Sequence, residues 1–358
     1  MTHIAYYVSG HGFGHAARQQ PIIKRLSDLC LTIHVRTSAP QKFFQAPNVV
    51  YHHQQYDIGT VQINAMRLDA QATFQWYADF LQNRQEALIA AEVAYLRQHD
   101  IRLVVTDIPP VACEIAAAAG IPCVVVTHFT WDWVYEHYIN AYPQYSYIVD
   151  SITASYHKAD LLLEMPFAHP MPQFDHIEKI PLVANPLTQT RQQVRDAFDV
   201  PDEHKLAVIS MGGMDWAGGL DAIQHKAGWT FIVTPAAWEQ VKDWPHTRLV
   251  GYGHGEFQNI LAAADLSIGK SGYSTMSEVI VHQTPMLFLT RENWREHDLL
   301  AAAMRKYNHS IEITHQQYEQ GDWIHWIDEL AAREGSLPTL PTNGADVAAQ
   351  KLFDLANR

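Results

Sequence analysis

Two histidines stand in a glycine-rich segment near the start of the chain, SGHGFGHAARQQP. Gly10, Gly12 and Gly14 allow a tight turn and a close approach between the backbone and a ligand. His11 and His15 bring imidazole rings into this loop, and a neutral imidazole is a suitable general base. The pattern predicts that one of the two histidines takes a proton from a hydroxyl group or a water molecule. It leaves open which one.

The segment follows a predicted strand over 4–9 and begins a predicted helix over 15–28. The free amides at the start of that helix would face an anion or a sugar oxygen. The spacing is not the dinucleotide fingerprint, and no acidic residue ends the second strand, LTIHVRT, to bind a ribose. A metal held by both histidines is the weaker interpretation, because glycines separate them and no third ligand lies nearby. No metal and no cofactor are expected.

Asp107 ends the predicted strand 101–107 and precedes two prolines. Ligands of open parallel sheets bind beyond the carboxyl ends of the strands, so Asp107 is expected close to the loop that carries His15. There it would orient the histidine ring and stabilise its charged form. The alternative is that Asp107 only caps the helix that follows Pro110.

An aromatic segment, THFTWDWVYEHY, follows the next predicted strand. Aromatic faces stack on sugar rings, but aromatic residues also fill hydrophobic cores. The segment weakly favours an acceptor-binding surface at His128, Trp131 and Trp133.

The most distinctive pattern of the second half is IGKSGYSTMSE. A strand over 266–270 runs into a Ser-Gly turn and then a helix, whose free N-terminal amides suit a diphosphate. Glu278 lies one helical turn further on, where it can accept hydrogen bonds from a ribose diol. The alternative is a helix end capped by Ser274 or Thr275 without any ligand. The donor-binding residues predicted from this pattern are Lys270, Ser271, Gly272, Tyr273, Ser274, Thr275 and Glu278.

Other segments add to the predicted donor side. SMGGMD follows a strand and supplies a second glycine turn, and TRENWREHD follows the strand over 285–290 with a polar cluster that can read the hydroxyls of a sugar. The additional donor-binding candidates are Gly12, Gly14, Gly212, Gly213, Met214, Glu296 and His297.

Strand-like and helical patterns alternate in both halves, which predicts an α/β fold built from parallel βαβ units. In addition to the ranges above, strands are expected at 31–37, 48–54, 123–129, 206–211, 230–235 and 247–251, and helices at 72–98 and 110–119. A proline-rich stretch over 165–186 separates the halves. We therefore expect Rossmann-like domains at 1–184 (acceptor side) and 185–340 (donor side), with a cleft between them. A C-terminal helix within 341–358 is expected to pack back on the first domain.

The composition sets wider limits. With 358 residues, 47% of them hydrophobic, the chain is long enough for two domains. A net charge of −13 without a basic run argues against nucleic-acid binding. No segment has the roughly 20 apolar residues of a membrane helix, and the first residues do not resemble a signal peptide. The three cysteines give no disulfide framework. A cytoplasmic protein without a transmembrane segment is expected.

The motifs resemble those of the GT-B glycosyltransferases, particularly the bacterial cell-wall N-acetylglucosaminyltransferase that uses a UDP-sugar. GHGFGH with His15 matches the loop after strand one in that family, and Ser271, Gly272, Thr275 and Glu278 match its Ser-Gly-x-x-Thr-x-x-Glu pattern. The resemblance implies that Glu278 holds the ribose and that the turn before it holds the diphosphate.

The same resemblance implies a base pocket around Tyr252 and Phe257, in GYGHGEFQNILAAAD. The chain departs from this family at Glu296 and His297, which replace a pair of glutamines, so we expect a different donor sugar. No membrane-docking patch is evident, which argues against a lipid acceptor.

Two other families are similar to the chain. A glycosyltransferase-like N-terminal domain of plant L-arabinokinases resembles nearly the whole chain, through the YYV, GHGFGHA, PVAC, TWDW and GK-GY-T-SE blocks. The sugar-kinase half of those proteins is not part of this likeness. The UDP-sugar hydrolase of the pseudaminic acid pathway is similar at GFGHAAR and SMGGMD, and it uses water as the acceptor with the loop histidine as the base.

The predicted function is transfer of a sugar from a nucleoside-diphosphate sugar, expected to be UDP-linked, to an unidentified hydroxyl acceptor. Inversion is expected because the first loop contains no nucleophilic carboxylate, and the helix amides would receive the leaving diphosphate without a metal. The alternatives are a nucleotide-sugar hydrolase and a non-catalytic module that binds a nucleotide-sugar.

Overall fold

The computed structural model describes residues 2–64, 67–211, 218–250, 257–289, 293–335 and 337–358. Contacts within the chain divide it into two compact units. Unit 1 comprises the chain up to Gln62, Leu68–Val183 and Pro341–Arg358, and unit 2 comprises Ile63–Arg67 and Ala184–Leu340.

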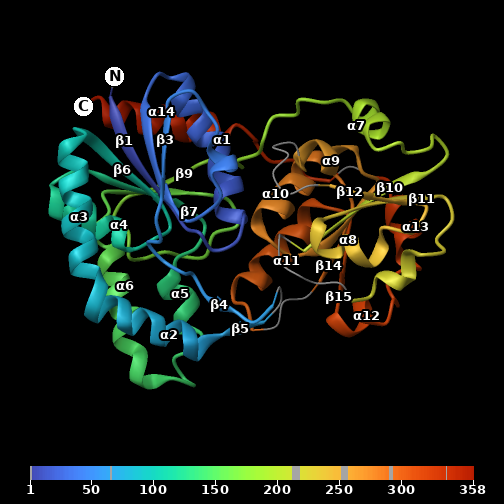
Figure 1. Ribbon diagram of the computed structural model, residues 1–358, viewed down its shortest axis with the longest axis horizontal. Coiled ribbons are helices and arrows are strands. Elements are labelled where there is room, and N and C mark those ends of the chain that lie inside the picture. Colours follow the sequence, from blue (N-terminus) through green and yellow to red (C-terminus); the bar gives the residue numbers. More distant parts are fainter. Residues whose placement is uncertain (1, 65–66, 212–217, 251–256, 290–292, 336) are drawn as a thin grey trace. The chain divides into compact units, whose positions relative to one another are not determined.

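Unit 1 is built on a seven-stranded parallel sheet with the strand order β3-β2-β1-β6-β7-β8-β9 (Figure 1). The strands are β1 (His3–Val8), β2 (Thr32–Thr37), β3 (Val49–His53), β6 (Ile101–Asp107), β7 (Cys123–Thr127), β8 (Leu161–Glu164) and β9 (Ile177–Lys179). The central strands are almost continuously buried, as expected for a parallel sheet that is covered on both faces. All five strands predicted in this half are present.

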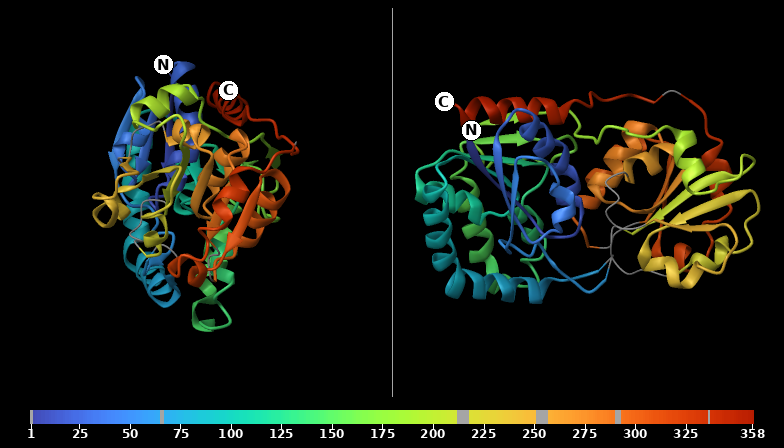
Figure 2. Two further views of the ribbon diagram at one scale, coloured as in Figure 1. Left: turned by 90° about the vertical axis from the view of Figure 1, so that its right-hand side faces the viewer. Right: turned by 45° about the horizontal axis from the view of Figure 1, so that its top comes forward.

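Helices cover both faces of this sheet, with α1 and α14 together on one face and α3, α4 and α6 on the other (Figures 1 and 2). The helical segments of unit 1 are α1 (Gly14–Asp28), η1 (Gln41–Phe44), α2 (Ala70–Asp79), η2 (Phe80–Arg84), α3 (Gln85–Gln98), α4 (Val111–Ala119), α5 (Trp131–Glu136), η3 (Pro143–Tyr145), α6 (Ser146–Tyr156) and α14 (Gly344–Ala356). The hairpin β4 (Val61–Gln62) and β5 (Leu68–Asp69) precedes α2. Gly120 ends α4 in the left-handed conformation, φ 71°, where glycine is favoured.

The single helix predicted over 72–98 is interrupted. Asp69 caps α2 by accepting a hydrogen bond from the Ala72 amide, and the π-helical turn η2 then joins α2 to α3. Periodicity alone does not reveal such a turn, because the flanking residues remain helical.

The C-terminal helix α14 packs against α1, within unit 1. Arg25 of α1 pairs with Asp346 at 2.7 Å, and Lys351 pairs with Glu178 of β9 at 2.6 Å. The last residues of the chain thus complete the fold of unit 1.

Unit 2 contains a six-stranded parallel sheet with the order β12-β11-β10-β13-β14-β15. Its strands are β10 (Lys205–Ser210), β11 (Trp229–Val233), β12 (Thr247–Leu249), β13 (Leu266–Lys270), β14 (Met286–Leu289) and β15 (Ser310–Ile313). Its helical segments are α7 (Arg191–Ala197), η4 (Leu220–Ile223), α8 (Pro235–Val241), α9 (Phe257–Ala263), α10 (Tyr273–His282), α11 (Glu296–Tyr307), α12 (His315–Glu319) and α13 (Trp326–Ala331). Thr190 begins α7 with a capping box.

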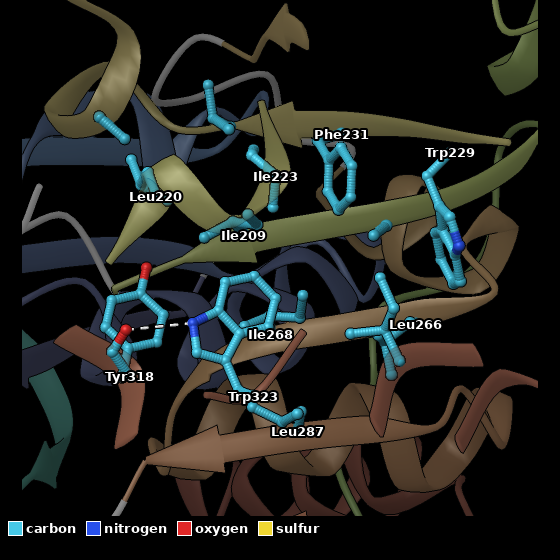
Figure 3. Close-up of a cluster of buried hydrophobic side chains, with 14 of the residues drawn as sticks. Ile209, Leu220, Ile223, Trp229, Phe231, Leu266, Ile268, Leu287, Tyr318 and Trp323 are labelled. Atoms are coloured by element: carbon cyan, nitrogen blue, oxygen red, sulfur yellow. Dashed lines mark hydrogen bonds between the residues drawn. The ribbon is translucent and has the colours of Figure 1, made fainter. Parts of the chain in front are cut away.

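One hydrophobic cluster fills the space beside this sheet (Figure 3). The rings of Tyr318 and Trp323 stack with centroids 5.6 Å apart, and the Trp323 indole donates a hydrogen bond of 3.1 Å to the Tyr318 carbonyl. Both side chains are fully buried with strand residues such as Ile209 and Ile268. The cluster fixes the strands whose carboxyl ends carry the predicted donor turns. Within the described parts of the chain, no helix combines the length and hydrophobicity needed to span a membrane.

Candidate active site

The first candidate site lies where the strand order of unit 1 changes direction. β1 pairs with β2 on one side and β6 on the other, so the loops after β1 and β6 open at a topological switch point. His15 is the second residue of α1, Asp107 is the last residue of β6, and His128 follows β7. The predicted neighbourhood of His15 and Asp107 is confirmed, with His15 Nδ1 3.3 Å from Asp107 Oδ1.

The Asp107 carboxylate is fully buried and receives several hydrogen bonds. Arg18 Nε donates to Oδ2 at 2.7 Å, Arg18 Nη2 donates to Oδ1, and Gln19 Nε2 donates to Oδ2 at 2.8 Å. Burial by itself would raise the pKa of this carboxyl, but the charges of Arg18 and His15 and their hydrogen bonds hold the pKa well below its usual range. Asp107 does not cap the next helix, because α4 begins after Pro110 without a side-chain cap.

His15 Nδ1 has two polar neighbours. Arg18 Nη2, at 2.9 Å, can only donate to it, and Asp107 Oδ1, at 3.3 Å, can only accept from it. Nε2 forms no hydrogen bond with the described residues, and the side chain keeps 6% exposure. A general base at Nε2 requires the tautomer in which the Nδ1 proton faces Asp107.

His11 lies in the loop between β1 and α1 and has a different environment. Its Nδ1 lies 3.2 Å from the carbonyl oxygen of Ile58, and its Nε2 lies 3.4 Å from Gln62 Nε2. Gly59, with φ 59°, packs so closely that a Cβ there would lie 2.4 Å from His11 Cγ. The Asp107 carboxylate behind His15 favours His15 as the base.

A second buried acid, Asp57, stands beside this loop and was not predicted. Ser9 Oγ and the Trp131 indole each donate to it at 2.8 Å. Burial raises the pKa of Asp57 to about 6, even though the charge of His15 and the two hydrogen bonds lower it. Through its hydrogen bonds from Ser9 and Trp131, Asp57 connects the start of the histidine loop to the aromatic segment.

The raised pKa of Asp57 makes stability depend on pH. The folded state binds this proton more tightly than the unfolded state, so the stabilisation is complete below the ordinary pKa of 3.8 and is lost as the pH rises through about 6. We expect Asp57→Asn to match the wild type in stability near pH 4 and to exceed it at pH 7 by about 2–3 kcal/mol. Urea unfolding at the two pH values measures the difference. An equal difference at both values would contradict the prediction.

The aromatic segment after β7 is mostly internal. His128 and Trp131 are fully buried, His128 Nδ1 lies 3.0 Å from Arg18 Nη1, and the Trp131 indole is used by Asp57. Trp133 stacks on His169 with ring centroids 4.1 Å apart. His128 and Trp131 thus offer no exposed face to an acceptor, because they serve as the supporting layer of the histidine loop.

The second candidate site is the turn between β13 and α10 in unit 2. Gly272 is the N-cap of α10, and no side-chain hydrogen bond caps the helix, so the Ser274 or Thr275 cap of the alternative interpretation is absent. A Cβ added to Gly272 would meet no atom of the described residues within 4 Å, and its φ of −105° does not require glycine. Neither backbone strain nor packing accounts for this glycine. The amides of the first turn remain suited to an anion.

Glu278 is held on one side only. Asn185 donates to its Oε1 from the backbone amide at 3.1 Å and from Nδ2 at 2.9 Å. Oε2 is buried, lies 3.3 Å from His282 Nε2 and has no hydrogen-bond donor among the described residues. A buried carboxylate oxygen without a donor is unusual, and a ligand hydroxyl would supply one.

His297 does not point toward a ligand as predicted. It joins Ser271 and Glu312, with Ser271 Oγ 2.9 Å from Nδ1 and Glu312 Oε1 2.8 Å from Nε2. The hydroxyl of Ser271 is likewise directed inward, and its side chain is fully buried. These two residues brace the turn rather than face the space before it.

The remaining predicted donor residues are distributed as follows. Glu296 accepts a hydrogen bond of 2.7 Å from the Trp294 indole and is buried. Phe257 begins α9, Lys270 ends β13, and Tyr273 begins α10. Gly12 adopts φ 69° and Gly14 begins α1, both in unit 1. Gly212, Gly213, Met214 and Tyr252 lie outside the described residues.

Arg18, Gln19 and Asp57 are site residues that the sequence prediction missed. Arg18 and Gln19 follow His15 by three and four positions, so all three share one helix face. Polar residues at this spacing on the core side of α1 were an available signal. Asp57 had none, because its loop enters the site from β3, far away in sequence.

Comparison with known proteins supports this architecture. No family model matches the chain. The chain is 30% identical to the L-arabinokinase of Arabidopsis thaliana over 362 residues, which cover 98% of the chain and 34% of the relative. It thus spans about a third of the length of that curated relative, and the activity of the whole relative cannot be transferred to it.

Solved structures match both units together. The calicheamicin glycosyltransferase CalG4 aligns with 100% of the chain and 94% of its own length, at a TM-score of 0.60 and 14% identity. The MurG protein of Acinetobacter baumannii aligns with 99% of the chain and 100% of its own length, at 0.52 and 14%. The chain has the GT-B fold.

A third GT-B structure, a UDP-glucosyltransferase from Polygonum tinctorium, covers 100% of the chain and 99% of itself, at a TM-score of 0.61 and 11% identity. These structural alignments establish the GT-B fold. At such low sequence identity, the chemistry is argued from the residues of the site. Among the described residues, no group of three or more histidine, cysteine or carboxylate side chains is placed to hold a metal ion.

Proposed function

We propose that the chain is a glycosyltransferase that moves a sugar from a UDP-linked donor to a hydroxyl acceptor, with inversion at the anomeric carbon and without a metal. His15 carries the proposal. Its Nδ1 lies 3.3 Å from the Asp107 carboxylate, and its Nε2 is left without a partner among the described residues. In the tautomer with the Nδ1 proton toward Asp107, Nε2 is the base. His15 would take the acceptor proton as the hydroxyl oxygen attacks the anomeric carbon.

Unit 2 would hold the donor. The amides after Gly272 would receive the diphosphate as it leaves, so a metal is not needed to neutralise its charge. Glu278 would accept a hydrogen bond from the ribose with the oxygen that Asn185 does not use. The choice of UDP follows the resemblance to UDP-sugar enzymes, and the Polygonum tinctorium structure is named as a UDP-glucosyltransferase.

A thermal-shift screen against UDP, GDP, dTDP, CMP and their common sugar conjugates tests this proposal. A nucleotide present at 100 times its dissociation constant adds about 2.7 kcal/mol of stability, which is an easily measured shift. We expect UDP and a UDP-sugar to raise the melting temperature and CMP not to do so. The bound donor is then incubated alone and with alcohols. Free sugar without an alcohol would indicate a hydrolase, and binding without turnover would indicate a binding module. If no nucleotide shifts the melting temperature, the assignment of the donor site to the turn before α10 and to Glu278 is wrong.

A further inference from the structure

Arg18 is a cation in direct contact with the proposed base. It lies one turn after His15 in α1 and is 4% exposed. Its guanidinium group binds both oxygens of Asp107, and its Nη1 lies 3.0 Å from His128 Nδ1. A guanidinium nitrogen only donates, so His128 Nδ1 accepts and the His128 ring is neutral. The charges of Arg18 and Asp107 therefore form one buried, compensated pair.

The same group lies against the His15 ring. Arg18 Nη2 is 2.9 Å from His15 Nδ1, which is shorter than the 3.3 Å between His15 Nδ1 and Asp107 Oδ1. A protonated His15 would place a second cation in contact with the guanidinium group, in a site that solvent does not screen. The position of His15 at the start of α1 adds to this effect, because the N-terminal end of a helix disfavours a cation.

We propose that Arg18 is a positioning residue that cancels the charge of Asp107 and keeps the His15 ring neutral. Asp107 then orients the ring without drawing a proton to it, unlike the acid of an unpaired Asp-His couple. This inference rests on the proposed function for its catalytic meaning, since a neutral ring is what a base needs.

The other ionisable groups near His15 do not supply this effect. His128 is neutral, and Asp57, whose pKa the charge of His15 lowers, is an acid and therefore favours a charged His15 ring instead of opposing it. The ring of His11 is 6.4 Å from the ring of His15, centroid to centroid. Arg18 is thus the cation in direct contact with His15 among the described residues.

Protonation of His15 can be measured in the ligand-free protein. Nitrogen-15 NMR of the histidine side chains gives the pH at which each ring takes up its proton, and the signal that disappears in His15→Asn identifies the relevant one. We expect Arg18→Gln to move proton uptake by His15 to a pH higher by about 1–2 units, because Asp107 then attracts the proton unopposed. Asp107→Asn should move it in the opposite direction.

Gln19→Met is the matched control. It removes a hydrogen bond to the same carboxylate but no charge, so the pH of proton uptake should stay within a few tenths of a unit. The double variant Arg18→Gln, Asp107→Asn removes both charges and should return close to the wild type. It also keeps the test decisive if Arg18→Gln alone does not fold.

Two results would overturn the inference: an unshifted His15 signal in Arg18→Gln, or a shift in Gln19→Met as large as that in Arg18→Gln. If Arg18→Gln does not fold, the inference would be overturned by a double variant whose pH of proton uptake by His15 differs from the wild type as much as that of Asp107→Asn does. The experiment uses no nucleotide. If the His15 signals shift as predicted but no nucleotide binds in the thermal-shift screen, only the proposed function is wrong. If the protein turns over a nucleotide-sugar but the His15 signals do not shift, only the role of Arg18 is wrong.

Discussion

Replacing His15 by alanine should reduce turnover of the nucleotide-sugar by at least about 10²–10⁴-fold, the usual contribution of a positioned general base. Nucleotide binding should stay largely unchanged, because the residues proposed to hold the diphosphate and the ribose belong to unit 2. The rate of nucleotide release and the affinity for UDP, measured on the same preparation, separate the two effects.

His11→Ala is the appropriate control. His11 lies in the same loop, and its nitrogens face the Ile58 carbonyl and Gln62. We expect it to lower turnover far less than His15→Ala. Unchanged turnover in His15→Ala, or an equal loss in both variants, would remove His15 from its proposed role.

The second large effect concerns stability. Arg18→Gln and Asp107→Asn each leave one buried charge of the pair without its partner, which costs about 3–5 kcal/mol. The double variant removes both charges and should recover most of this loss, because no charge is then left uncompensated. Scanning calorimetry of the four proteins gives the full cycle.

Strict additivity of the two losses would contradict this expectation, because it would mean that the charges do not interact. Gln19→Met again serves as the control. It removes the hydrogen bonds that Gln19 makes with Asp107, with the Val126 carbonyl and with the Tyr6 hydroxyl, at about 1 kcal/mol each, but it takes away no charge.

Most of the fold could be predicted because its signals are local. Buried parallel strands such as IRLVVTD read as apolar runs, and Gly120 and Thr190 mark helix boundaries through backbone and capping chemistry. The strands β4, β5, β8, β9 and β15 were missed. They have only two to four residues each, and β9 is exposed throughout, so β9 also lacks the hydrophobic pattern of a buried strand.

Site residues could be placed from the sequence only where they lie at or just after the carboxyl end of a predicted strand. His15 and Asp107 could be paired in advance, because parallel strands bring their carboxyl ends to one edge of the sheet. The sequence could not show that Arg18 takes the same carboxylate, or that His297 turns inward to Ser271. Those contacts depend on side-chain direction and on partners distant in sequence, which periodicity does not encode.

Unit 2 is proposed to bind a nucleoside-diphosphate sugar through the turn before α10 and through Glu278. Calorimetric titration of UDP into the wild type and into Glu278→Gln tests this proposal. The amide oxygen of the variant can still accept both hydrogen bonds from Asn185, so the helix keeps its support while the charge proposed to face the ribose is lost. We predict binding by the wild type and an affinity about 10- to 100-fold lower in the variant, as for the loss of a charged hydrogen bond. Equal affinity in the two proteins, or no binding of UDP by the wild type, would contradict the account.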